Sequence, residues 1–210
     1  MTQVDFYFDF ISPYVWLASH QLGEVRACTA AKFRFVPVLF AALLDHHSNL
    51  GPAEIPAKRR YTFQDAERWA VYLGLKLKSP PAHPFNSLTA LRVTSAIDND
   101  GVREAFAVRL LDAAWSEGRD IASKSVGLNG EELLGKTHAD EIKQKLRIQT
   151  ESAIQAGVFG VPSFVVAGEI FWGNDRLHLL KAYLQGKLHT DKAKVEEILA
   201  RPRTADRPRK

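Results

Sequence analysis

VDFYFDFISPYVWL, residues 4–17, is the segment around which the rest of this chain is organised. In its first half, apolar residues alternate with other side chains, with Val4, Phe6, Phe8 and Phe10 at every second position. A period of two, rich in aromatic residues, predicts a β-strand. The second half predicts a helix that follows this strand almost directly.

Ser12 and Pro13 occupy the expected junction between the strand and the helix. Serine accepts a hydrogen bond from a backbone N–H at a helix N-cap, and proline needs no donor at the first helical position. Unpaired amides and the positive end of the helix dipole favour an anion at such a point. Two interpretations stay open on these residues alone: Ser12 only caps the helix, or it belongs to an anion-binding site.

Length and composition indicate a globular chain. Its 210 residues can bury a sizeable core, and 46% of them are hydrophobic against 25% charged. The net charge of +4 is modest, and part of it lies in the Pro-rich end RPRTADRPRK, residues 201–210, which we expect to be disordered. Nucleic-acid binding would require a basic face with interleaved aromatic residues, and because we find none we expect no nucleic-acid partner.

No secretory or membrane-spanning segment is recognisable in the sequence. Asp5 and Asp9 interrupt the apolar N-terminal run, and no apolar run approaches the length of a membrane span. Cys28 is the single cysteine, so an intrachain disulfide is excluded and we expect its thiol to be buried as a small apolar group. We therefore expect a soluble, cytoplasmic protein with no membrane partner.

The first strand is expected to form a strand–helix–strand unit. We expect a helix from about Pro13 to Cys28 and a second strand at 33–39, FRFVPVL, in which Pro37 indicates a sheet edge or a bulge. This order predicts that the two strands pair in parallel.

From residue 61 to residue 157 the signals are almost all helical. Residues 41–58 are expected to form a loop before this block. Asn86 and the pair Thr137 and Asp140 resemble helix caps. One apolar face at helical spacing joins Val102, Phe106, Leu110 and Ala113. The expected helices cover residues 63–73, 86–98, 102–117, 120–125, 131–134 and 137–157.

The C-terminal part returns to strands. SFVVA at 163–167 and IFW at 170–172 flank a turn and predict a β-hairpin, after which Asn174 or Asp175 is expected to cap a last helix ending near Leu184. The order of elements is α/β and thioredoxin-like, with an interruption in its middle. We therefore predict a thioredoxin-like domain at residues 1–40 and 137–188, an inserted all-helical subdomain at 41–136, and a C-terminal tail at 189–210.

Such a layout usually carries a Cys-x-x-Cys dithiol at the start of its first helix. This chain has Ser12-Pro13-Tyr14-Val15 there, so ordinary thiol–disulfide exchange is excluded. Val161-Pro162 precedes the hairpin, where a thioredoxin-like layout places a cis-proline loop that faces the first helix. Outside that layout the pair would be an ordinary turn. Within it, the main chain of Val161 is a candidate to hold a peptide-like cofactor.

Other candidate sites carry weaker signals. His46 and His47 are adjacent in an expected loop, and we expect no metal there. The run Lys58-Arg59-Arg60 is either a solvated face or a contact for an acidic ligand. Nucleophile elbows, P-loops, zinc-protease motifs and dinucleotide-binding loops are absent from the sequence.

Three motifs carry a family resemblance: FYFDFISPYVWLA at 6–18, GVFGVPSFVV at 157–166 and FWGNDRL at 171–177. They resemble the 2-hydroxychromene-2-carboxylate isomerases, a family grouped with kappa-class glutathione transferases and the DsbA-like disulfide-forming oxidoreductases. The resemblance spans about residues 3–188, and FWGNDRL is its most specific part. Val15-Trp16 departs from the family, which often has a small residue followed by an aromatic one.

The resemblance implies a glutathione cofactor bound between the two domains. Ser12 would donate a hydrogen bond to the glutathione sulfur and favour its thiolate, since a free thiol has a pKa of about 8.5. Val161 would hold the peptide main chain, Asp175 would pair with the γ-glutamyl ammonium, and Lys58 would pair with the glycine carboxylate. The implied cofactor-binding residues are Ser12, which is also the catalytic residue, Pro13, Tyr14, Asn49, Lys58, Val161, Pro162, Asn174 and Asp175.

The reaction implied by the resemblance is isomerisation of 2-hydroxychromene-2-carboxylate, a small aromatic acid, to trans-o-hydroxybenzylidenepyruvate in naphthalene-type degradation. Reversible thiolate addition would turn a double bond into a single bond about which the substrate rotates. A kappa-like glutathione transferase acting on another electrophile and a non-catalytic peptide-binding module remain alternatives. Relatives of this kind are dimers, so the resemblance also implies a homodimer.

Overall fold

A computed structural model describes residues 1–122 and 139–205 of the chain. Within them a mixed sheet has the order β2-β1-β3-β4, formed by β1 (Gln3–Phe8), β2 (Lys32–Pro37), β3 (Ser163–Val166) and β4 (Glu169–Trp172). β1 pairs with β2 in parallel and with β3 antiparallel, and β3 and β4 form an antiparallel hairpin. The predicted parallel unit and the predicted hairpin are confirmed, and Pro37 lies on an edge strand.

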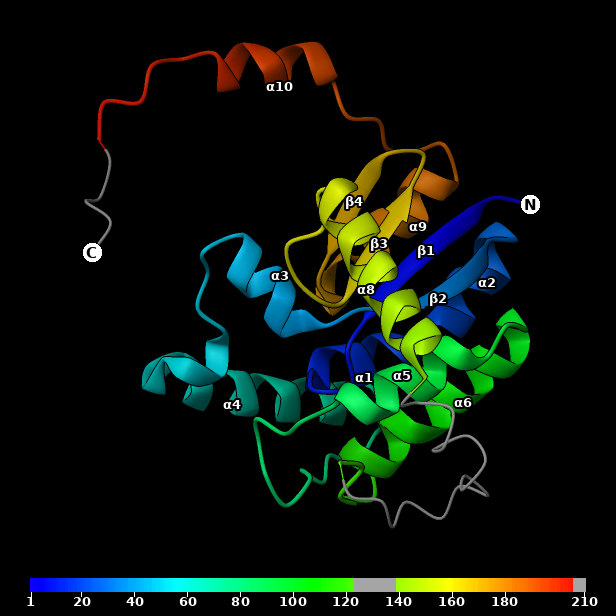
Figure 1. Cartoon of the computed structure of the whole chain (residues 1–210). Helices are drawn as coiled ribbons and strands as arrows, with labels where there is room; N and C mark the ends of the chain where they lie inside the picture. The colour runs from blue at the N-terminus through cyan, green and yellow to red at the C-terminus, as the bar shows by residue number, and fades with distance from the viewer. Residues whose placement is uncertain (123–138, 206–210) are drawn as a thin grey trace.

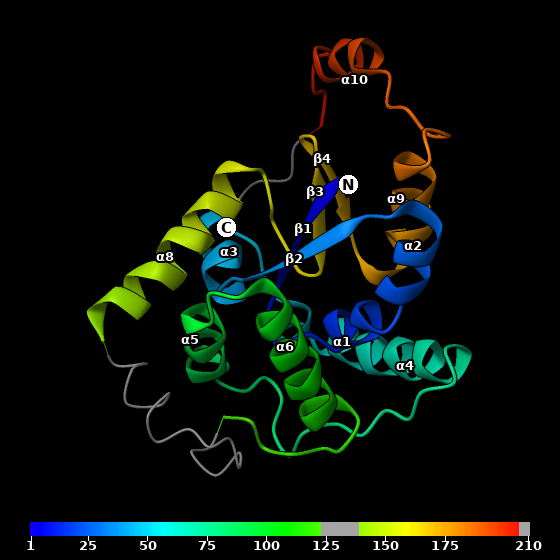
Figure 2. The same ribbon diagram turned by 90° about the vertical axis from the view of Figure 1, so that its right-hand side faces the viewer.

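Helices lie on both sides of this sheet and beyond one end of it (Figure 1). They are α1 (Pro13–Ser19), α2 (Leu22–Thr29), α3 (Phe40–His46), α4 (Pro56–Tyr72), α5 (Leu88–Ala96), α6 (Asp100–Trp115), α8 (Asp140–Gln155), α9 (Leu177–Leu184) and α10 (Lys192–Leu199), with the 3₁₀ turns η1 (Pro52–Glu54) and η2 (Asn174–Arg176). Figure 2 shows α2 and α9 on one side of the sheet and α3 and α8 on the other. The predicted thioredoxin-like α/β class is confirmed, whereas the boundaries of the inserted subdomain stay a prediction.

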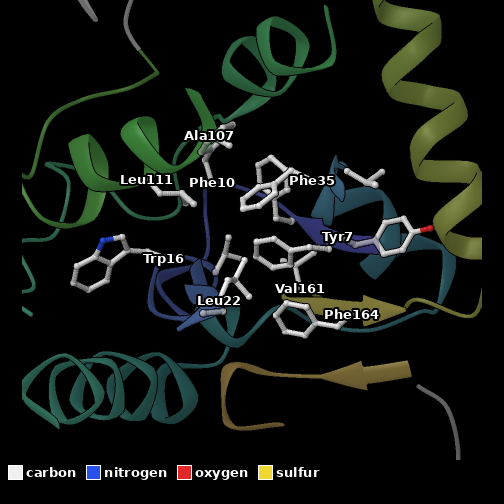
Figure 3. Close-up of a cluster of buried hydrophobic side chains, with 14 of the residues drawn as sticks. Tyr7, Phe10, Trp16, Leu22, Phe35, Ala107, Leu111, Val161 and Phe164 are labelled. Carbon is white, nitrogen blue, oxygen red and sulfur yellow. The ribbon is translucent and has the colours of Figure 1, made fainter. Parts of the chain in front are cut away.

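The core is built around β1, the central aromatic strand (Figure 3). Phe6 is fully buried, stacks on Phe164 with 4.8 Å between ring centroids, and meets Phe35 edge-on at 4.9 Å. Such aromatic pairs contribute about 0.5–1.5 kcal/mol beyond the burial of their surface. The alternation that predicted a strand therefore also supplies residues at the centre of the hydrophobic core.

Two tryptophans fix the connection between β1 and α1 against α6. The Trp115 indole N–H donates to the carbonyl of Phe10 at 2.9 Å, and the Trp16 indole N–H donates to Asp112 at 2.9 Å. Both tryptophans are fully buried. Ser12 thus lies on a short connection that is held at both ends by the packed core.

The single helix expected from Pro13 to Cys28 is wrong, because the chain breaks it into α1 and α2. The Ser19 hydroxyl donates to the carbonyl of Trp16 at 2.7 Å, and the Gln21 side-chain amide donates to the carbonyl of Leu17 at 3.0 Å. Side chains that bond these carbonyls compete with the helical backbone pattern. Cys28, expected to be buried, is exposed, since only the earlier turns of α2 face the core through Leu22 and Val25.

The loop expected at residues 41–58 is only partly correct. α3 occupies Phe40–His46, and α4 begins at Pro56, seven residues before the expected start at Phe63. Pro56 stands at the first helical position, where proline is favoured. The basic run at 58–60 therefore belongs to the first turns of a long helix.

Some expected helical details in the middle of the chain differ. α5 begins at Leu88 rather than Asn86, although the Asn86 side chain accepts the Leu88 N–H at 3.0 Å. Val102, expected on the inward face of α6, is 56% exposed. Residues 120–122 are not helical, α8 begins at Asp140 with Ala139 as its N-cap, and the expected features at 123–125, 131–134 and Thr137 lie outside the described residues.

The C-terminal end also departs from expectation. α9 is preceded by η2 and has Arg176 at its N-cap, so neither Asn174 nor Asp175 caps it. The expected tail contains a further helix, α10, that stands away from the body of the fold in Figure 1. Residues 201–205 have no regular structure, and residues 206–210 lie outside the described part of the chain.

Candidate active site

A cavity of about 1010 Å³ lies beyond the carboxyl end of β1. The start of α1, the loop before β3, and the first turns of α3 and α4 form its wall, together with a loop around Pro84. The predicted site residues on this wall are Ser12, Pro13, Tyr14, Asn49, Lys58 and Val161. The wall does not include Pro162, Asn174 and Asp175. The structure thus brings most of the predicted residues to one cavity, from segments far apart in the chain.

Ser12 stands at the N-cap of α1 but makes no capping hydrogen bond with its side chain. The predicted N-cap position is confirmed, whereas the interpretation in which the Ser12 hydroxyl only caps the helix is wrong. Its own carbonyl accepts the Val15 N–H at 3.1 Å, and the residue is 9% exposed. The hydroxyl stays available for a ligand on the cavity wall. α1 has only 7 residues, so its dipole is weaker than that of the long helix expected.

The Val161–Pro162 peptide bond is cis, as the thioredoxin-like layout predicted. Val161 lies on the cavity wall, and among the described residues its backbone N–H and C=O make no hydrogen bond. A free backbone edge of this kind can pair with an extended peptide. Pro162 is instead used by the fold, because its carbonyl accepts the Gly173 N–H at 2.9 Å.

An aromatic pair extends the cavity wall beside this loop. Phe159 and Trp172 meet with 4.9 Å between ring centroids, and they are 38% and 51% exposed. Gly160 lies beneath them, where a Cβ would be only 2.7 Å from the Trp172 indole nitrogen. Glycine is therefore required at 160 for the indole to lie over the loop.

Asn174 and Asp175 lie outside the cavity, next to α1. Asn174 is 4% exposed, and its side-chain nitrogen has no partner among the described residues. Asp175 pairs with its neighbour Arg176. The structure therefore does not bring these two predicted cofactor contacts to the wall that carries Ser12.

Tyr14 presents its ring to the cavity while its hydroxyl is engaged elsewhere. The phenol O–H donates to Asp65 of α4 at 3.0 Å. Burial, followed by the charge of Asp65, raises the pKa of Tyr14, so the phenol stays protonated at neutral pH. The bond ties α1 to α4 across the base of the site.

Asp9 is a cavity residue that the sequence analysis did not single out. It is 1% exposed, and its carboxylate accepts the N–H groups of Ile11 at 3.1 Å and Phe40 at 2.9 Å. Burial raises the pKa of Asp9, and hydrogen bonds from Ser87 and the backbone partly offset this. The sequence feature that could have identified Asp9 is an acidic residue between two core phenylalanines, because a charge in that position must find internal hydrogen-bond partners.

His83 is a second cavity residue missed at first. Its Nε2 lies 3.1 Å from the carbonyl of Ile11, and because a carbonyl only accepts, Nε2 carries the proton. Nδ1 is buried without a partner in the described residues. Burial, with the nearby charge of Arg59, lowers the pKa of His83 below 6.5, so the ring is neutral at pH 7. Nothing in the local sequence marks this contact.

His46 and His47 lie at the C-terminal end of α3 and contact each other. The His46 and His47 rings meet edge-on at 4.9 Å, and His47 Nε2 lies 3.2 Å from the carbonyl of Val158. Within residues 1–122 and 139–205, no group of three or more His, Cys, Asp or Glu side chains is placed to hold a metal ion. No helix in those ranges is long and apolar enough to cross a membrane.

A family model described as a DSBA-like thioredoxin domain matches residues 3–185. This chain belongs to the DsbA-like thioredoxin family. The match includes the whole sheet and the cis-proline loop, whereas α10 lies beyond it. Within this family, Ser12 occupies the helix start at which the sequence analysis sought a dithiol.

Relatives of this DsbA-like chain carry two kinds of name. It is 28% identical over 194 residues to the 2-hydroxychromene-2-carboxylate isomerase of Pseudomonas sp. (strain C18). The aligned residues make up 87% of this chain and 90% of that relative. It is 27% identical to glutathione S-transferase kappa 1 of Homo sapiens, covering 88% and 91% of the two chains. A solved 2-hydroxychromene-2-carboxylate isomerase superposes with a TM-score of 0.80 at 25% identity, over 95% of this chain and 100% of the other. The resemblance drawn from the three motifs is confirmed.

Proposed function

We propose that this DsbA-like chain is a glutathione-dependent isomerase that converts 2-hydroxychromene-2-carboxylate to trans-o-hydroxybenzylidenepyruvate in aromatic degradation. The observation that carries the proposal is the Ser12 hydroxyl, which lies on the cavity wall without a capping hydrogen bond. The similarity to proteins named as such isomerases supports the choice of reaction.

The residues on the cavity wall fit glutathione, a peptide that carries one thiol and has a carboxylate at each end. The unpaired backbone of Val161 offers a peptide its N–H and C=O, and Lys58 offers a charge to the glycine carboxylate. Asn49, just before η1 in the chain, lines the same cavity as Lys58. Asn174 and Asp175 would contribute only through a shift of η2 toward the cavity, because neither lines it.

Glutathione, when bound, supplies a thiolate that can add reversibly to a conjugated acid. Ser12 donates a hydrogen bond to the sulfur, which favours the anion and lowers the pKa of the thiol below about 8.5. His83 holds the carbonyl of Ile11 and so helps to fix the peptide that leads into Ser12. The apolar wall around Phe40 and Phe63 limits water near the reacting atoms.

The test is glutathione binding by calorimetry, with the ultraviolet absorbance of the thiolate followed against pH. We expect the full chain to bind glutathione and to lower the pKa of its thiol, and Ser12→Ala to return that pKa toward about 8.5. Ser12→Thr, which keeps a hydroxyl, should retain part of the shift. Turnover of the chromene acid is then measured directly. Failure of the wild-type chain to bind glutathione would contradict the proposal.

The kappa transferases among the relatives support one alternative reaction at the same site, addition of glutathione to another electrophile. Turnover of such an electrophile without isomerisation of the chromene acid would favour it. Glutathione binding without any turnover would favour a non-catalytic groove. The homodimer and the cytoplasmic location stay predictions, which light scattering and fractionation test.

A further inference from the structure

The basic run at residues 58–60 divides between the cavity and solvent. Lys58 and Arg59 line the cavity, whereas Arg60 does not. In the described part of the chain, no carboxylate lies within ion-pair distance of Lys58 or Arg59. Adjacent cations on an apolar wall without counter-ions indicate that the cavity takes anionic ligands.

The carboxylates on the same wall are already engaged by the backbone. Glu54 accepts the Gly51 N–H at 2.5 Å, and Asp9 accepts backbone N–H groups from two segments. Each is used to hold a loop. The positive charges of the basic run are therefore left to a ligand.

Arg59 is positioned at the edge of an aromatic cluster. Its Nη2 donates to the carbonyl of His83 at 3.2 Å, and its guanidinium carbon lies 5.8 Å from the centroid of the Phe63 ring. Phe63 meets the His83 ring edge-on at 5.0 Å. Arginine has five N–H donors, and those not used by the His83 carbonyl can reach a ligand.

The same cluster connects Arg59 to the catalytic serine. His83 bonds the carbonyl of Ile11, and Ile11 precedes Ser12 in the chain. Phe63, His83, Ile11 and Ser12 all line the cavity. A ligand held by Arg59 against Phe63 therefore shares one cavity with the sulfur that Ser12 is proposed to bind.

We propose that Arg59 binds the carboxylate of a planar aromatic acid whose ring lies against Phe63, and so selects the second substrate of the site. A planar guanidinium matches a carboxylate with parallel hydrogen bonds, and an aromatic neighbour matches a flat ring. The inference rests on the proposed function, in which Lys58 takes the glycine carboxylate of glutathione. The two cations then serve two different anions.

The test compares an acid with its uncharged counterpart. Binding of coumarin-3-carboxylate and of coumarin to the full chain is measured by calorimetry, alone and with saturating glutathione. We expect Arg59→Gln to weaken binding of the acid up to about fivefold, the size set by an exposed ion pair, and to change binding of coumarin little. Arg59→Lys should fall between, and Arg60→Gln should match the wild type. Circular dichroism confirms that each variant is folded.

Glutathione titrations separate this inference from the proposed function. Lys58→Gln should weaken glutathione binding up to about fivefold, whereas Arg59→Gln should leave the glutathione affinity unchanged. Equal loss of glutathione affinity in both variants would overturn the inference, as would equal binding of acid and coumarin by the wild type. If the chain binds no glutathione but Arg59→Gln still weakens the acid, the proposed function fails while the aromatic-acid subsite stands.

Discussion

The cavity has a buried wall and an exposed wall. On the sheet side, Asp9, Ser12 and Val161 are 1%, 9% and 8% exposed and lie next to the packed strand β1. On the helix side, Asn49, Lys58 and Arg59 are all exposed, and the described residues offer the two cations no ion-pair partner. The same cavity is thus built from a tightly held half and a loosely held half.

This difference in burial indicates that the two walls have different roles in ligand binding. In the proposed function, the Ser12 hydroxyl would donate to a sulfur and would need a fixed position, which buried neighbours supply. Charges that attract flexible carboxylates act over longer distances and tolerate movement. We therefore expect substitutions on the sheet side to affect stability and substitutions on the helix side to affect affinity.

The largest effect is expected in the strand that supports the buried wall. Phe6→Ala should lower the free energy of unfolding by about 3–5 kcal/mol, because it removes a fully buried ring that contacts Phe35 and Phe164. Chemical denaturation measures it. Phe6→Leu, which keeps most of the apolar volume, is the matched variant and should cost clearly less. Similar costs for both would show that the ring contacts matter little.

A smaller effect with a distinct pH dependence is expected at Asp9. Asp9→Asn should lower the free energy of unfolding by about 1–3 kcal/mol near pH 4, because each carboxyl oxygen accepts one backbone N–H and the amide would put an NH2 donor, which cannot accept, against one of them. Burial raises the pKa of Asp9, so the native state binds the proton more tightly than the unfolded chain. The difference in free energy of unfolding between the wild type and Asp9→Asn should therefore become smaller as the pH rises from about 4 through the raised pKa.

Asp5→Asn is the control for that experiment. Asp5 lies on the same strand but pairs with Arg34 at the surface, at 2.6 Å. We expect its substitution to cost less than about 1 kcal/mol. A gap between wild type and Asp9→Asn that widens with rising pH would mean that the buried carboxylate is stabilised as the anion.

The smallest effect on stability is expected on the exposed wall. Lys58→Gln should leave the denaturation midpoint unchanged while it weakens glutathione binding up to about fivefold, since no ion pair involves Lys58 in the described residues. Thermal melts with and without glutathione measure both quantities. A marked loss of stability in Lys58→Gln would remove the distinction between the two walls.

Local patterns in the sequence were enough to predict the strands and the loop that form the buried wall of the cavity. Alternation predicted β1 and the hairpin, and the layout predicted the cis bond at Val161–Pro162 and placed Ser12 at a helix start. These features depend on residues close in sequence, whose period or backbone restriction is visible without the fold. The same patterns missed α3. They also missed the break between α1 and α2, where the side chains of Ser19 and Gln21 donate to backbone carbonyls.

The sequence alone therefore determined the strand, the serine at its end and the family, because each depends on neighbouring residues. Only the tertiary structure decided that Asp9 is buried against Phe40, that His83 bonds Ile11, and that Arg59 rather than Arg60 reaches the cavity. Asp9 and Phe40 are 31 positions apart, and Ile11 and His83 are 72 apart. No local period records such a contact, since it exists only when packing brings distant segments together.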